Sequence, residues 1–237
     1  MEKRVCVMSG LYIIPRWFFG FDVALELLFG VATLAVALYA FRIYSLSRER
    51  QCQTLGAGFL SISLAYFVWS GVSLLLLLQN SAGTVSLDNL TRTALFGVFS
   101  YVFLSILGLS TLVYMTFPSR PKRLFSLIAT LALLVLIFSQ QKSLAFYFVS
   151  AFLTFFVLTH YVQEYARSRR TTTFLVMLGF AFIFLGMLDF TFASIQGLHY
   201  AIGHVLLLIG YMLVMASLLV VLVPLRRTWR AKEPVLK

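Results

Sequence analysis

The chain has 237 residues, of which 61% are hydrophobic and 11% are charged, and its mean hydropathy is +0.94. This composition lies far outside that of soluble domains and excludes a water-soluble globular protein. The net charge of +11 comes from basic residues at the ends of apolar runs, not from one folded basic face. That distribution argues against nucleic-acid binding and predicts contact with the lipid bilayer and its anionic headgroups.

Seven apolar stretches predict membrane spans, because a helix needs about 20 mostly apolar residues to cross a hydrocarbon layer roughly 30 Å thick. None of the stretches alternates apolar and polar residues as the strands of a membrane barrel do. We therefore expect an all-α, polytopic protein in which residues 1–237 form a single membrane domain of seven helices. The predicted spans are 17–39, 55–78, 94–117, 124–138, 144–161, 174–195 and 201–225, and the fourth is the shortest.

Lysine and arginine gather on one side of this predicted topology. Short loops rich in these residues stay on the cytoplasmic side of a membrane. The bias predicts a multi-pass protein of the cell membrane with its N-terminus outside and its C-terminus in the cytoplasm. The richer side holds Arg42, Arg48, Arg50, Arg120, Lys122, Arg123, Arg167, Arg169, Arg170, Arg226, Arg227, Arg230, Lys232 and Lys237, and the poorer side holds Lys3, Arg4, Arg16, Arg92 and Lys142.

A weak internal repeat follows the first and fifth predicted spans. When the sequence is shifted by 121 positions, seven residues match within a stretch of 21. The match favours two parallel repeats, in which spans one to three correspond to spans five to seven and span four links them. Chance similarity among apolar residues is the alternative. The matches are Tyr44, Ser47, Arg48, Gly58, Phe59, Ile62 and Leu64 with Tyr165, Ser168, Arg169, Gly179, Phe180, Ile183 and Leu185.

A layout of three, one and three spans resembles that of microbial rhodopsins and of small sugar transporters of the SWEET type. The seventh span has no lysine for a retinal Schiff base, since Lys142 is in a loop and Lys232 and Lys237 are in the tail, which argues against retinal. A Pro-Gln pair is also missing from the chain. In its composition and its pattern of spans, the sequence resembles seven-helix membrane proteins of unassigned activity from prokaryotic, including archaeal, genomes. This resemblance implies no activity.

Ionisable residues within the predicted spans are few, and each is a candidate site because charge is costly in hydrocarbon. Asp22 and Glu26 are four residues apart and so share one face of the first span. In a sequential ring of helices the first span neighbours the seventh and the seventh neighbours the sixth, which brings these candidates toward one outward-facing pocket. The candidates are Asp22, Glu26, Arg92, Asp189, His199 and His204.

Structural pairing is the alternative interpretation of these residues. Arg16 or Arg92 could neutralise Asp22, and Asp189 could pair with His204. Of the candidates, we favour Glu26 first because it lies deepest in its span.

Metal and haem binding have little support in the pattern. Glu26, Asp189 and His204 offer ligand types that suit zinc or copper. His199 and His204 are five residues apart, or about 140° around a helix, so they do not share a face. His160 and His204 lie near opposite membrane surfaces, about 20 Å apart at 1.5 Å per residue, which argues against a haem held between two histidines.

Three functions compete at this point. We favour a protein that handles a small solute, a cation or a proton at the outward-facing pocket, as a sensor or a transporter. The alternative is a non-catalytic assembly subunit whose glycine-rich helix faces pack on a membrane-protein partner or on a second copy. An intramembrane metal hydrolase is third, because the sequence has no motif for a catalytic residue.

Overall fold

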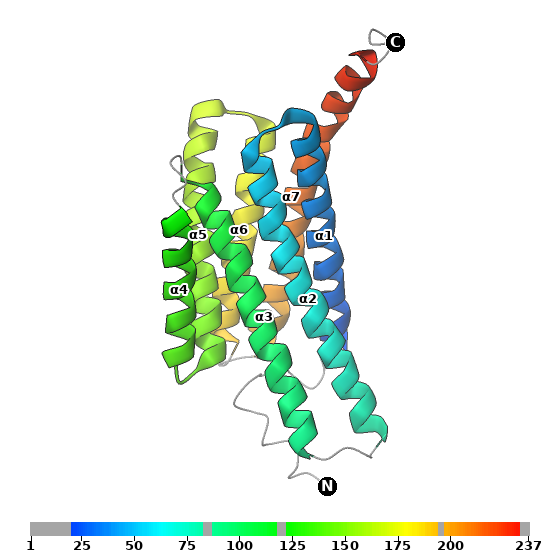
Figure 1. The fold of residues 1–237 in the computed structure, drawn as a ribbon, viewed down its shortest axis with the longest axis vertical. Helices are drawn as coiled ribbons and strands as arrows, with labels where there is room; N and C mark the ends of the chain where they lie inside the picture. The colour runs from blue at the N-terminus through cyan, green and yellow to red at the C-terminus, as the bar shows by residue number, and fades with distance from the viewer. Residues whose placement is uncertain (1–19, 83–86, 118–121, 194–196, 233–237) are drawn as a thin grey trace.

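A computed structural model describes residues 20–82, 87–117, 122–193 and 197–232 (Figure 1). Within these ranges the chain is helical and has no strand, so the predicted all-α class is confirmed. Six of the helices are long and apolar enough to cross a membrane, as expected of a multi-pass membrane protein. The helices are α1 (Phe21–Ser47), α2 (Arg50–Ala82), α3 (Leu87–Met115), α4 (Lys122–Phe138), α5 (Lys142–Ser168), α6 (Thr171–Phe192) and α7 (Gly197–Lys232).

Six helices form a closed ring in the order α1, α2, α3, α5, α6, α7. Each packs on the next, and α7 closes the ring against α1. The expected neighbours, α1 beside α7 and α7 beside α6, are therefore found. The expected ring of seven is wrong, because α3 packs directly on α5 and excludes α4 from the ring.

Helix α4 lies outside this ring, against α3 and α5 (Figure 1). It has 17 residues and is therefore about 26 Å long, shorter than the six helices of the ring. Its position and length fit a connection that returns the chain from one end of the bundle to the other. The centre of the ring is then formed by side chains of the other six helices.

The two ends of the bundle differ in charge. We call the end with the α1–α2 and α5–α6 turns the arginine end, because Arg48 and Arg169 sit in these turns. Both adopt the left-handed conformation that ends a helix, with φ of 61° and 52°. Their N–H groups donate to the carbonyls of Tyr44 and Tyr165 at 2.8 Å and 2.9 Å. The opposite end, where α1 begins and α6 ends, is called the acidic end.

Large apolar side chains face away from the bundle on every helix of the ring. Leu38, Phe99, Phe148 and Val205 are among those with about half or more of their surface exposed. On a soluble protein such a belt would favour association, whereas in a bilayer it contacts the acyl chains. The polar groups that need explanation are therefore those inside the ring.

Candidate functional site

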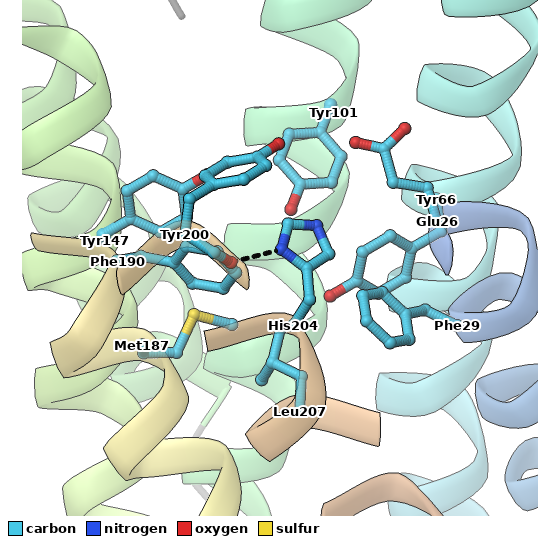
Figure 2. A pocket seen from close by; sticks show the side chains of 10 residues that line it. All are labelled: Glu26, Phe29, Tyr66, Tyr101, Tyr147, Met187, Phe190, Tyr200, His204 and Leu207. Atoms are coloured by element: carbon cyan, nitrogen blue, oxygen red, sulfur yellow. Dashed lines mark hydrogen bonds between the residues drawn. The ribbon is translucent and has the colours of Figure 1, made fainter. Parts of the chain in front are cut away.

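A cavity lies inside the ring toward the acidic end, and all six ring helices contribute to its wall (Figure 2). The centre of a water-sized sphere can reach about 10 Å³ of it, within an empty space of about 280 Å³ that includes open solvent. Glu26 is the one carboxylate among the lining residues that the structure describes. They are Glu26, Phe29, Tyr66, Tyr101, Tyr147, Met187, Phe190, Tyr200, His204 and Leu207.

Glu26 projects from the second turn of α1 and is only 4% exposed. The indole Nε1–H of Trp69, on α2, donates to its Oε1 at 2.5 Å. Its other oxygen, Oε2, is buried and has no hydrogen-bond partner among the described residues. A carboxylate oxygen without a partner is costly inside a bilayer, so this group requires a proton or a cation to neutralise it.

Asp22 lies one turn before Glu26 and is tied to α7 by two contacts. The hydroxyl of Tyr200 donates to Asp22 Oδ1 at 2.6 Å, and His204 Nε2 lies 3.2 Å from the same oxygen. The other ring nitrogen of His204, Nδ1, is 2.7 Å from the backbone carbonyl of Tyr200. A carbonyl only accepts, so Nδ1 carries a hydrogen.

This geometry determines how Asp22 and His204 share a proton. With Nδ1 protonated, the contact between Nε2 and the carboxyl group needs a second hydrogen, on either the imidazole or Asp22. A hydrogen at this contact would make the pair neutral overall, whichever of the two side chains carries it. The pair lies beside the cavity, because His204 also lines the cavity wall (Figure 2).

Asp189 and His199 form a second acid–imidazole pair between α6 and α7. His199 Nδ1 lies 2.6 Å from Asp189 Oδ1. The side chain of His199 is 35% exposed and that of Asp189 is 17% exposed, and neither belongs to the cavity wall. The two histidines of α7 thus take different acids, with His204 against Asp22 and His199 against Asp189. This separation follows from the angle of about 140° between positions five apart on a helix.

Arg92 lies elsewhere. It is exposed near the start of α3, a helix that packs on α2, α4 and α5 but not on α1 or α7. The structure therefore brings together Asp22, Glu26 and His204, while Asp189 and His199 form a pair of their own. Arg16, the other expected partner of Asp22, lies outside the described residues.

The metal and haem hypotheses gain no support from these positions. In the part of the chain that the structure describes, no group of three or more His, Cys, Asp and Glu side chains could hold a metal ion. His160 lies in the last third of α5, toward the arginine end, where it contacts the ring of Tyr161. His204 lies in the second turn of α7, toward the acidic end.

Four tyrosines of the cavity wall were not predicted from the sequence. Tyr66, Tyr101, Tyr147 and Tyr200 come from α2, α3, α5 and α7, and Figure 2 shows them around His204. Tyr66 also shares a hydrogen bond of 3.0 Å with Tyr211, one layer deeper in the bundle. A tyrosine in the middle of a span, away from the interfacial belt, needs a partner for its hydroxyl. For Tyr66 and Tyr101, which lie well inside the predicted spans 55–78 and 94–117, that position was the signal available in the sequence.

Comparisons of the chain with protein-family models, with curated proteins and with solved structures find no match. The function therefore has to be inferred from the chemistry of the cavity. That chemistry consists of one carboxylate with an oxygen that lacks a partner among the described residues, a neighbouring acid–imidazole pair, and a wall of tyrosine hydroxyls and aromatic rings.

Proposed function

We propose that this multi-pass membrane protein binds a proton or a water-sized cation at Glu26, in the cavity at the centre of its six-helix ring. The observation that carries the proposal is the buried Glu26 Oε2, which has no hydrogen-bond partner among the described residues and belongs to a side chain that lines the cavity. Asp189 Oδ2 is also buried without such a partner, but Asp189 does not line the cavity. An intramembrane carboxylate of this kind is costly to maintain and commonly marks an ion or proton pathway. The site is neutral when Glu26 carries a proton or when its carboxylate is paired with a monovalent cation.

The size and the wall of the cavity favour a small occupant. Pockets for organic ligands usually measure 300–1,000 Å³, whereas the centre of a water-sized sphere can reach only about 10 Å³ of this cavity. Tyrosine hydroxyls can both donate and accept hydrogen bonds, and the neighbouring Asp22 carboxyl and His204 imidazole are groups that can exchange a proton. These features support a proton or a hydrogen-bonding monovalent cation over a sugar-sized solute.

The direction of the cavity is part of the proposal. With the arginine end on the cytoplasmic side, as the positive-inside rule requires, the cavity lies in the outer half of the cell membrane. The N-terminus is then outside and the C-terminus in the cytoplasm.

The competing functions have weaker support. Close glycine contacts were the basis for an assembly subunit, but those of Gly58, Gly108, Gly179 and Gly210 are all made with helices of the same chain. They therefore need no partner protein. A metal hydrolase needs a ligand cluster that the described residues do not contain.

Replacing Glu26 by Gln tests the proposal, with Asp189→Asn as the matched control. Glu26→Gln keeps an oxygen that can accept from Trp69 but removes the charge and the titratable group. Wild-type protein in lipid nanodiscs is melted at increasing Na⁺, K⁺ and NH₄⁺ and across a pH series. A bound cation stabilises the protein by about 2.7 kcal/mol at a hundred times its dissociation constant. We expect the cation or pH response to disappear in Glu26→Gln and to persist in Asp189→Asn.

Infrared spectroscopy separates the two occupants. If the occupant is a proton, the pH-difference spectrum shows a carboxylic C=O band that is lost in Glu26→Gln, and the three salts have equal effects. If it is a cation, one salt stabilises more than the others. A Glu26→Gln variant that melts at a lower temperature but keeps every cation and pH response of the wild type would show that Glu26 is structural only.

A further inference from the structure

The packing of α2 on α3 is repeated in that of α6 on α7. A Cβ added to Gly108 would lie 2.8 Å from the carbonyl oxygen of Gly58, and one added to Gly210 would lie 2.8 Å from that of Gly179. Both distances are too short for any residue but glycine at these positions. Gly58 and Gly179 are 121 positions apart, which is the shift found in the sequence. The same close crossing therefore occurs at equivalent places in the two halves.

Helices α1 and α5 are equivalent at the same shift. Thr33 and Thr154 are both fully buried, and each hydroxyl donates to the carbonyl four residues earlier, at 2.6 Å and 2.7 Å. Val36 and Val157, one turn further on, are both fully buried as well. These two pairs lie before the stretches 44–64 and 165–185 in which the sequence repeat was found. The agreement between the two halves therefore extends into α1 and α5.

The ring maps onto itself when α1, α2 and α3 are exchanged with α5, α6 and α7. Each helix then takes the place opposite its own, and the α1–α7 contact takes the place of the α3–α5 contact. Wherever the structure places another side chain or carbonyl close to one of its glycines, both helices belong to the same set of three. The two sets are tightly packed within themselves and meet each other through side chains.

Phe59 and Phe180 meet at the centre of this arrangement. They lie on the opposing helices α2 and α6, 121 positions apart, and are 0% and 1% exposed. Their ring centroids are 6.3 Å apart. Two equivalent residues from the two sets can touch only near the axis that relates the sets, so the pair marks that axis.

The phenylalanine pair separates polar groups on its two sides. Toward the acidic end, the Phe59 ring contacts Tyr211, which shares its hydrogen bond with Tyr66 of the cavity wall. Tyr66 is seven residues from Phe59 on α2, or about 10 Å along the helix. Toward the arginine end, the ring of Tyr161 stacks on Phe180 at 5.3 Å. The two buried phenylalanine rings thus lie between the hydrogen-bonded Tyr66–Tyr211 pair on one side and Tyr161 on the other.

We propose that the chain is built of two three-helix repeats, α1–α3 and α5–α7, and that it translocates the proton or cation of Glu26 along the axis between them, with Phe59 and Phe180 as the gate. This inference rests on the proposed function and selects transport over sensing. A dry apolar constriction stops ions and water when it is closed. Parallel repeats that meet at a central site open it to alternate sides by rocking against each other.

Proton and cation flux into proteoliposomes tests the gate. Purified full-length protein is reconstituted with a pH-sensitive dye inside, and a potassium gradient with valinomycin sets the membrane potential. We expect Phe59→Ala and Phe180→Ala each to raise the proton flux, or the flux of added Na⁺ or NH₄⁺, by roughly tenfold or more, since this requires only a modest drop in the barrier. The matched control is Leu112→Ala, a buried residue that packs inside one repeat and away from the axis.

Phe59→Leu and Phe180→Leu are measured alongside, because they keep an apolar side chain and disturb folding less. We expect both leucine variants to raise the flux, but by less than the alanine variants do. The double variant Glu26→Gln/Phe59→Ala should lose the added flux, since the path begins at Glu26.

Each other result overturns the gate. An equal rise in Leu112→Ala, or a rise that survives Glu26→Gln, would show a nonspecific leak through a loosened bundle. If wild type and all phenylalanine variants conduct no more than empty liposomes while Glu26 still gives its cation or pH response, translocation is wrong and the proposed binding function stands. If Glu26→Gln changes no binding response, the proposed function itself has failed.

Discussion

At the scale of single residues, α1 carries two buried carboxyl groups in different situations, one in the cavity wall and one beside it. Asp22 is compensated by the Tyr200 hydroxyl and the His204 imidazole, whereas Glu26 has only the Trp69 indole on one of its oxygens. The difference arises because the two positions are one turn apart on α1 and reach different helices. Asp22 faces α7, and Glu26 faces α2 and the open space.

This difference predicts a coupled effect of substitutions at Asp22 and His204. Asp22→Asn or His204→Gln alone should lower the free energy of unfolding by up to about 3–5 kcal/mol, because each leaves a buried group without its proton partner. The double variant should lose less free energy of unfolding than the two single variants lose together, and the difference is a coupling energy of about 0.5–3 kcal/mol. Denaturant unfolding in micelles measures all four proteins. Strictly additive losses would show that the two side chains do not share a proton.

At the scale of helices, close packing depends on a few glycines. Gly108 lies against the α2 backbone, whereas Gly71, also on a ring helix, has no side chain or neighbouring backbone within 4 Å of an added Cβ. The two glycines have the same helix propensity but different surroundings. They therefore separate the cost of a clash from the intrinsic preference for alanine.

Gly108→Ala and Gly210→Ala should each destabilise the protein by about 1–3 kcal/mol, because the crossing helices must move apart. The two losses should be similar, since the two crossings have the same geometry. Gly71→Ala should be neutral or stabilise by up to about 1 kcal/mol through helix propensity. Thermal melting of the three variants in nanodiscs measures these changes. A loss in Gly71→Ala as large as that in Gly108→Ala would contradict the role of the crossing.

At the scale of the whole molecule, the orientation decides what the cavity faces. Gln140 is exposed between α4 and α5 at the acidic end, and Glu49 is exposed between α1 and α2 at the arginine end. Single cysteines at these two positions, in a background with Cys6→Ser and Cys52→Ser, report on the two sides of the membrane.

In intact cells, an impermeant thiol reagent should label Gln140→Cys and leave Glu49→Cys unlabelled until the membrane is opened. The reason is the basic bias of the arginine end, because short loops rich in lysine and arginine stay on the cytoplasmic side of a membrane. Labelling after permeabilisation is the control for reactivity at both positions. Labelling of Glu49→Cys alone in intact cells would reverse the orientation and place the cavity on the cytoplasmic side.

The sequence by itself determined the class and much of the layout. Runs of apolar residues of span length admit few structures other than helices in a bilayer, because every backbone polar group must find its partner within the segment. The spacing of four between Asp22 and Glu26 also predicted that they share one face of α1, and both are buried. These features are local, so they can be inferred from neighbouring residues alone.

Only the tertiary structure decided which helices form the ring and which groups meet inside it. Contacts between helices far apart in the chain exclude α4 from the ring and form the tyrosine wall of the cavity. Such contacts also pair His204 with Asp22, whereas His199 pairs with Asp189. Apolar helix surfaces are chemically alike in sequence, and a bilayer provides no hydrophobic force that selects one pairing. The fit of small residues and the rotation of each helix about its axis make that choice, and both are set by the folded bundle.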